Sequence, residues 1–170
     1  MWLRAFFQGC VMGELKYPVR DYSGPPDWDD LGVDYAGSGL LFFGLSVDEL
    51  IRRARGQVAF LAVPYAELTT GRALVAQETA EWRAQLLPNL VTVSPAVDVE
   101  TLLETGRASV SPANNIARWR RMTRMYLKPA DAVVIPPIGG REKSREVHQI
   151  AESALTANRP VYVIGAGVRL

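Results

Sequence analysis

The sequence predicts a single α/β domain with a parallel sheet of four to five strands and helices on both faces. Three observations predict it. Short continuous apolar runs, typical of strands buried on both faces, recur along the chain from residue 57 onward. Amphipathic helical stretches separate these runs. The 170 residues suffice for one sizeable core and are few for two. This pattern is Rossmann-like or flavodoxin-like.

The beginning of the chain, residues 1–45, shows no sustained periodicity of apolar residues. "YSGPPDWDD" (22–30) has the Pro, Gly and Asp density of a loop. We expect an irregular N-terminal arm packed on the domain, either as a structural or oligomer contact or as cover for a pocket. The α/β domain is expected over residues 46–170, beginning with a helix that Ser46 and Glu49 cap and Gly56 ends.

In the rest of the chain, continuous apolar runs predict the strands, and apolar stripes at helical spacing predict the helices. Pro64 must end the first strand because it cannot continue a sheet ladder. Apolar side chains at helical spacing identify the helices, as with Val75, Thr79, Trp82 and Leu86. The expected strands are 57–65, 90–95, 131–137 and 160–165, and the expected long helices are 71–87, 114–127 and 143–157.

Composition excludes several classes of function. The formal net charge of +1 nominates no partner by itself. A single cysteine, Cys10, and a single histidine leave no internal disulfide and little for a zinc site, so we expect no metal and no cofactor. No apolar run approaches the ~20 residues that span a bilayer. The apolar stretch before Cys10 is too short for a signal peptide. We therefore expect a cytoplasmic protein, with Cys10 an ordinary small residue.

Ligands of parallel sheets bind beyond the carboxyl ends of the strands. That rule nominates three loops: 63–71 ("VPYAELTTG"), 94–100 ("SPAVDVE") and 136–144 ("PPIGGREKS"). The last loop, with Gly139 and Gly140, leads into a helix start that favours an anion. Ser144 is a helix cap or a phosphate ligand, and the basic side chains Arg141, Lys143 and Arg145 add positive charge. The alternative is a capped helix start with solvated charges.

Four segments in order, "VAFLAVPY", "VTVSP", "ADAVVIPPIGGREKS" and "RPVYVIG", resemble the nucleoside 2-deoxyribosyltransferase-like superfamily over about residues 57–165. The small bacterial branches and the deoxynucleotide N-glycosidases are the most similar in pattern. The resemblance implies a nucleoside or nucleotide ligand, with Pro64 and Tyr65 bordering its pocket. It implies that Gly140 forms the binding turn and that Ser144 binds a 5′-phosphate.

The chain departs from that family at its catalytic position. The family's nucleophilic glutamate falls on Ile150, and a family glycine falls on Glu146. Retaining cleavage of an N-glycosidic bond needs a carboxylate beneath the anomeric carbon, which isoleucine does not supply. Glu146 lies one helical turn earlier on the same face, either as a displaced nucleophile or as a side chain that fills the pocket. The chain is accordingly an N-glycosidase or deoxyribosyltransferase, or a non-catalytic nucleotide-binding or scaffold protein.

Other charged residues carry weaker expectations. Glu67 and Asp98 are candidates for base recognition or acid catalysis from the first two loops. Glu152 is expected to face solvent, and His148 to be a surface residue or a proton-transfer group. Five basic residues, Arg118, Arg120, Arg121, Arg124 and Lys128, lie in or directly after one predicted helix, whose aromatic residues fall on the apolar stripe. Nucleic-acid binding is not expected from that pattern. We expect this basic face to be solvated or to contact another subunit, and we expect a homo-oligomer.

Overall fold

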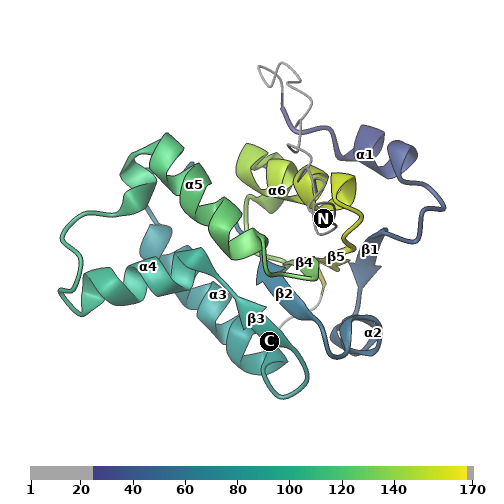
Figure 1. Ribbon diagram of the computed structural model, residues 1–170, viewed down its shortest axis with the longest axis horizontal. Helices are drawn as coiled ribbons and strands as arrows, with labels where there is room; N and C mark the ends of the chain where they lie inside the picture. Colours follow the sequence, from purple (N-terminus) through teal and green to yellow (C-terminus); the bar gives the residue numbers. More distant parts are fainter. Residues whose placement is uncertain (1–24, 168–170) are drawn as a thin grey trace, which may run out of the picture.

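A computed structural model describes residues 25–167 and shows one five-stranded sheet (Figure 1). The strands are β1 (Leu41–Leu45), β2 (Val58–Leu61), β3 (Val91–Val93), β4 (Ala132–Ile135) and β5 (Val161–Ile164). Their order across the sheet is β1-β5-β4-β2-β3, and every neighbouring pair is parallel. The prediction of four parallel strands in the second part of the chain is confirmed, with boundaries shorter by one to a few residues.

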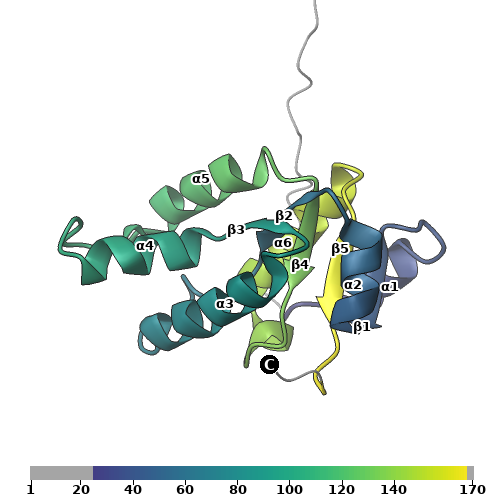
Figure 2. The same cartoon turned by 90° about the horizontal axis from the view of Figure 1, so that it is seen from below.

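Helices cover both faces of the sheet, as predicted. The helices are α1 (Trp28–Asp34), α2 (Val47–Ala54), α3 (Arg72–Leu86), α4 (Pro95–Glu104), α5 (Ile116–Leu127) and α6 (Arg145–Thr156). Two short 3-10 turns, η1 (Pro112–Asn114) and η2 (Arg141–Lys143), precede α5 and α6. The apolar side chains of α1 and α6 form a core with one face, and those of α2 and α3 form a core with the other. Figure 2 shows α3, α4 and α5 gathered beyond the β3 side.

The expectation of an irregular arm over residues 1–45 is wrong for its second half. Asp27 caps α1 by accepting a hydrogen bond from the amide of Asp30 at 2.9 Å. Strand β1 pairs in parallel with β5, so the sheet begins before residue 46. The strand is an apolar run, LFFGL, but Gly44 at φ +69° interrupts it and glycines also precede it, so the sequence was interpreted as part of an irregular segment. Residues 1–24, including Cys10, lie outside the described residues.

The strand order places a topological switch point between β2 and β4. From β2 the chain moves outward to β3, then returns across β2 to β4 and continues to β5 in the opposite direction. This is the flavodoxin-like order, except that the outermost strand beside β5 comes from the beginning of the chain. Crevices at such points are where α/β proteins bind ligands. The loops that follow β2 and β4 meet at this point.

The loop expected over residues 94–100 is also different in the structure. Ser94 caps α4 by accepting from the amide of Val97 at 3.5 Å, and Pro95 occupies the first helical position, where its missing N–H costs nothing. Helix α4 then packs along α3, and it reaches the loop after β2 through Glu100, which accepts a hydrogen bond from the Tyr65 hydroxyl. The second of the three nominated loops is therefore a structural helix.

Candidate functional site

The loop after β2 and the start of α6 are joined by reciprocal hydrogen bonds, in which each segment contributes a carboxylate that accepts from the other. The Oε2 atom of Glu146 accepts hydrogen bonds from the backbone amides of Tyr65 and Ala66, at 3.0 and 2.7 Å. In return, the carboxylate of Glu67 accepts from the Ser144 hydroxyl at 2.8 Å and from the amide of Glu146 at 3.1 Å. The two segments lie about 80 residues apart in the sequence, and these four bonds join them at the switch point.

Glu146 is the most enclosed acidic group of this junction. Its other oxygen, Oε1, accepts from the indole Nε1 of Trp119 on α5, so three N–H donors surround the carboxylate. Burial raises the pKa of Glu146 above its usual range, and the three donors act in the opposite direction because they favour the ionised form. The nearby Glu67 adds to the increase. Glu146 therefore joins three elements through one half-buried carboxylate.

Tyr65 and Arg72 hold the loop after β2 in one conformation. The Tyr65 ring stacks on Trp119 with ring centroids 4.8 Å apart, and its hydroxyl donates to Glu100. Burial, followed by that hydrogen bond, raises the pKa of the Tyr65 phenol. The Arg72 guanidinium donates to the carbonyls of Tyr65 and Ala66, at 3.2 and 3.1 Å. The predicted pocket residue Tyr65 is thus fully buried, as is Pro64 beside it.

Ser144 acts as the cap of α6, one of its two predicted roles. Its hydroxyl accepts from the amide of Val147 at 3.1 Å and donates to Glu67, and the residue is 3 % exposed. Gly140, at φ +85°, makes the predicted turn, and neither Gly139 nor Gly140 has an atom within 4 Å of the place a side chain would take. The anion position at this helix start is filled by the carboxylate of Glu67. The phosphate role predicted for Ser144 is not supported by this arrangement.

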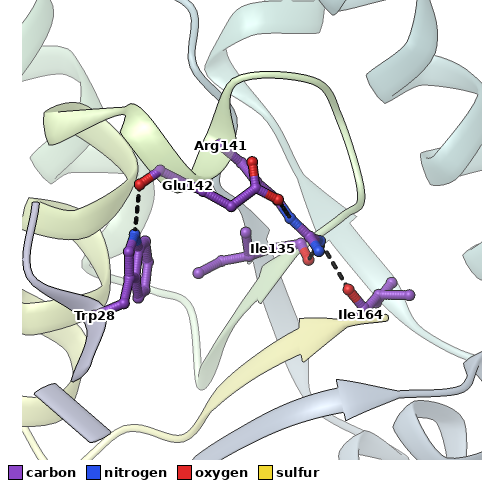
Figure 3. Close-up of polar contacts among 5 residues, drawn as sticks. All are labelled: Trp28, Ile135, Arg141, Glu142 and Ile164. Carbon is purple, nitrogen blue, oxygen red and sulfur yellow. Dashed lines mark hydrogen bonds and ion pairs between the residues drawn. The ribbon is translucent and has the colours of Figure 1, made fainter. Parts of the chain in front are cut away.

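Arg141 points into the protein and not toward a ligand, contrary to the prediction. Figure 3 shows its side chain lying beneath the turn against the ends of β4 and β5. Its Nη1 donates to the carbonyls of Ile135 and Ile164, at 3.3 and 2.7 Å, and its Nε pairs with Glu142 at 2.9 Å. Both carbonyls belong to the last residues of their strands, so the buried guanidinium joins the carboxyl ends of β4 and β5. On the opposite side of the turn, Trp28 donates to the Glu142 carbonyl at 3.0 Å.

A groove of about 710 Å³ runs between α5 and α6, with one end at the Glu67 and Glu146 junction. Its floor is apolar and includes Trp119, Leu127 and Ile150. Ile150 is only 7 % exposed and belongs to the core between α6 and the sheet. The remaining lining residues are Ile116, Arg120, Thr123, Arg124, Arg145, Gln149, Glu152, Ser153 and Thr156. Volumes of this size are typical of sites for small organic molecules.

The groove contains only part of the predicted site. Of the nominated residues, Glu67 and Glu146 line it, whereas Pro64, Tyr65 and Ser144 lie beside the junction. The sequence analysis did not predict the contribution of α5. Its basic residues were noticed, but they were assigned to a solvated or inter-subunit face. Arg120 and Arg124, one helical turn apart, in fact face the groove.

Three other nominated residues have structural contacts. Asp98 lies on α4 and pairs with Arg83 at 3.1 Å, so it is not part of the junction. His148 has its Nε2 3.0 Å from the Asp27 carbonyl and its ring against Trp28, with centroids 5.1 Å apart. It therefore holds α1 against α6. Glu152, expected to face solvent, is half-buried along the groove.

The fold and the groove define a flavodoxin-like α/β protein with a cavity of ligand size between two helices at its switch point. Comparisons with known proteins add no closer assignment: no protein-family model, no curated protein and no solved structure matches this chain. Within residues 25–167, no helix combines the length and the apolar character needed to cross a membrane.

Proposed function

We propose that this protein binds a nucleoside or nucleotide in the α5–α6 groove and does not cleave its N-glycosidic bond. The groove itself carries the proposal. It combines ligand-sized volume, an apolar floor for a base or sugar, and a polar rim at the switch point of the sheet. Gln149 and Ser153 supply amide and hydroxyl groups that suit base edges and sugar hydroxyls.

The state of the two candidate nucleophile positions argues against catalysis. Ile150, at the position of the family's glutamate, is packed in the core beneath the groove. Glu146 is ionisable, but both of its oxygens already accept hydrogen bonds from the protein. A carboxylate that attacks or stabilises an anomeric carbon must direct an oxygen at it. Holding the junction together is the role that these contacts give Glu146.

Calorimetry on the full chain tests the binding. The ligands are the four common deoxynucleosides and their 5′-monophosphates, and we expect at least one to bind. Ser153→Trp fills the groove from α6 and should abolish that binding. Ala84→Trp, on an exposed face of α3 away from the groove, is the matched control and should not. Failure of all eight ligands to bind, or binding that Ser153→Trp leaves unchanged, contradicts the proposal.

A base-release assay tests the absence of catalysis. The wild-type chain should release no free base from the same deoxynucleosides and monophosphates. Turnover that Glu146→Gln abolishes would instead identify Glu146 as a displaced nucleophile. Since Glu146 also holds the junction, the variant must be shown to be folded at the assay temperature before its activity is interpreted.

A further inference from the structure

We propose that the anionic group of the ligand is bound by α5, through Arg120, Thr123 and Arg124, and not at the start of α6. This inference rests on the proposed function, in which the ligand is a nucleotide and the anion is its 5′-phosphate. All three residues line the same groove. They lie within five positions of one helix, so their side chains share one side of it.

Ser144 and Arg141, the two groups predicted to bind phosphate near the start of α6, are engaged within the protein. The Ser144 hydroxyl is engaged on both sides, by the amide of Val147 and by Glu67. Arg141 is buried against the ends of β4 and β5. The carboxylate of Glu67 already occupies the anion position, and an incoming phosphate would meet its negative charge there.

Helix α5, in contrast, presents uncommitted cationic groups to the groove. Within residues 25–167 the Arg120 side chain makes no hydrogen bond or ion pair, and Arg124 uses only its Nε, on the Arg120 carbonyl at 3.3 Å. The terminal Nη1 and Nη2 groups of both guanidinium groups are thus available for the bidentate hydrogen bonds that phosphate accepts. The acidic residues of the groove, Glu67, Glu146 and Glu152, come from the loop after β2 and from α6. The anion is therefore directed to the α5 wall.

Thr123 provides an independent observation. It is 7 % exposed and lines the groove, yet its Oγ1 has no hydrogen-bond partner in the described part of the chain. Buried hydroxyl groups are nearly always paired, so this one is suited to a partner that arrives with the ligand. Threonine in a helix occupies two rotamers readily, which allows the hydroxyl to turn toward a phosphate oxygen.

Calorimetry of nucleosides against their monophosphates tests the assignment. Wild type should bind a monophosphate at least about tenfold more tightly than its nucleoside, since charge-assisted hydrogen bonds to phosphate have that magnitude. The double variant Arg120→Gln/Arg124→Gln should lose most of this ratio. Arg121→Gln, an equal change at an exposed neighbour outside the groove, should retain it. Ser144→Ala should also retain the ratio.

The outcomes separate this inference from the proposed function. Monophosphate preference that survives the double variant, or that Ser144→Ala removes, overturns the α5 assignment while nucleotide binding stands. Inorganic pyrophosphate serves as the second probe. If nucleosides and nucleotides fail to bind but pyrophosphate binds through Arg120 and Arg124, the anion site stands and the proposed nucleotide function falls. Absence of binding by every probe overturns both.

Discussion

Replacement of Glu146 by glutamine probes the junction directly. The carboxylate accepts two backbone N–H groups on one oxygen and the Trp119 indole N–H on the other. A glutamine side chain has the same shape but offers one oxygen and one NH₂ group. Its oxygen is best placed on the two amides of Tyr65 and Ala66. The NH₂ group then faces the indole N–H, and two donors oppose each other in a half-buried site.

The expected loss of unfolding free energy follows from the hydrogen bonds that the glutamine loses and retains. One charge-assisted hydrogen bond is lost, worth about 1.5–3 kcal/mol, and the two retained bonds weaken because their acceptor is now neutral. Removal of a buried negative charge offsets part of this loss. We therefore expect Glu146→Gln to lower the free energy of unfolding by about 2 kcal/mol, a large fraction of the stability of a domain of this size.

A double-mutant cycle with Trp119→Phe identifies the cause. Phenylalanine removes the indole donor, so the glutamine NH₂ group no longer faces another donor. The loss of packing at position 119 lowers the unfolding free energy of the single and the double variant equally, so it cancels in the cycle. Urea unfolding of the four proteins should give a double variant more stable than the sum of the single changes predicts, by about 1 kcal/mol or more.

Two results would refute this account of the junction. The first is a Glu146→Gln variant as stable as wild type, which would mean that the carboxylate is not held by the three donors. The second is strict additivity of the two changes within the ~0.5 kcal/mol seen for independent sites. Either result would also reopen the question whether Glu146 is available for chemistry.

Three further predictions concern other buried polar groups. Because the folded chain raises the pKa of Tyr65 above 10, the unfolded chain loses this proton first as the pH rises, and the unfolding free energy should fall above pH 10. Tyr65→Phe should make that fall shallower by up to about 1.4 kcal/mol per pH unit in urea titrations at several pH values. Thr123→Val should raise the unfolding free energy by up to about 1 kcal/mol, because it removes an unpaired buried hydroxyl; a destabilised variant would show that Oγ1 has a partner. Arg141→Met should cost about 2–3 kcal/mol, by removing the charged donor of the Ile135 and Ile164 carbonyls, and an unchanged melting temperature would contradict that role.

Sequence patterns predicted the parts of the fold that depend on local order. The apolar runs gave β2 to β5, and the capping box of Ser46 and Glu49 is present as expected. Strand β1 was not predicted because Gly44 interrupts its apolar run and its burial follows no alternation along the strand. Helix α4 was not predicted because Pro95 was interpreted as the end of a strand and not as the first residue of a helix.

The site was less predictable because its contacts join distant segments. Spacing relative to a family motif singled out Glu146, but no local pattern relates it to amides about 80 residues earlier. Arg141 was expected to serve a ligand because its charge follows a glycine turn. Its inward direction depends on strand ends that only the assembled sheet brings together.

The place of β1 has a consequence for how the chain is made. Within the described sheet β1 has one neighbour, β5, and the paired residues Leu41 and Val161 are separated by nearly the whole length of the domain. Among the described strands, the first to leave the ribosome is therefore the last to find its partner. Until β5 emerges, β1 presents an unpaired edge that other chains can join. Closing so long a connection is slow for entropic reasons, so synthesis exposes this edge for longer than any other part of the sheet.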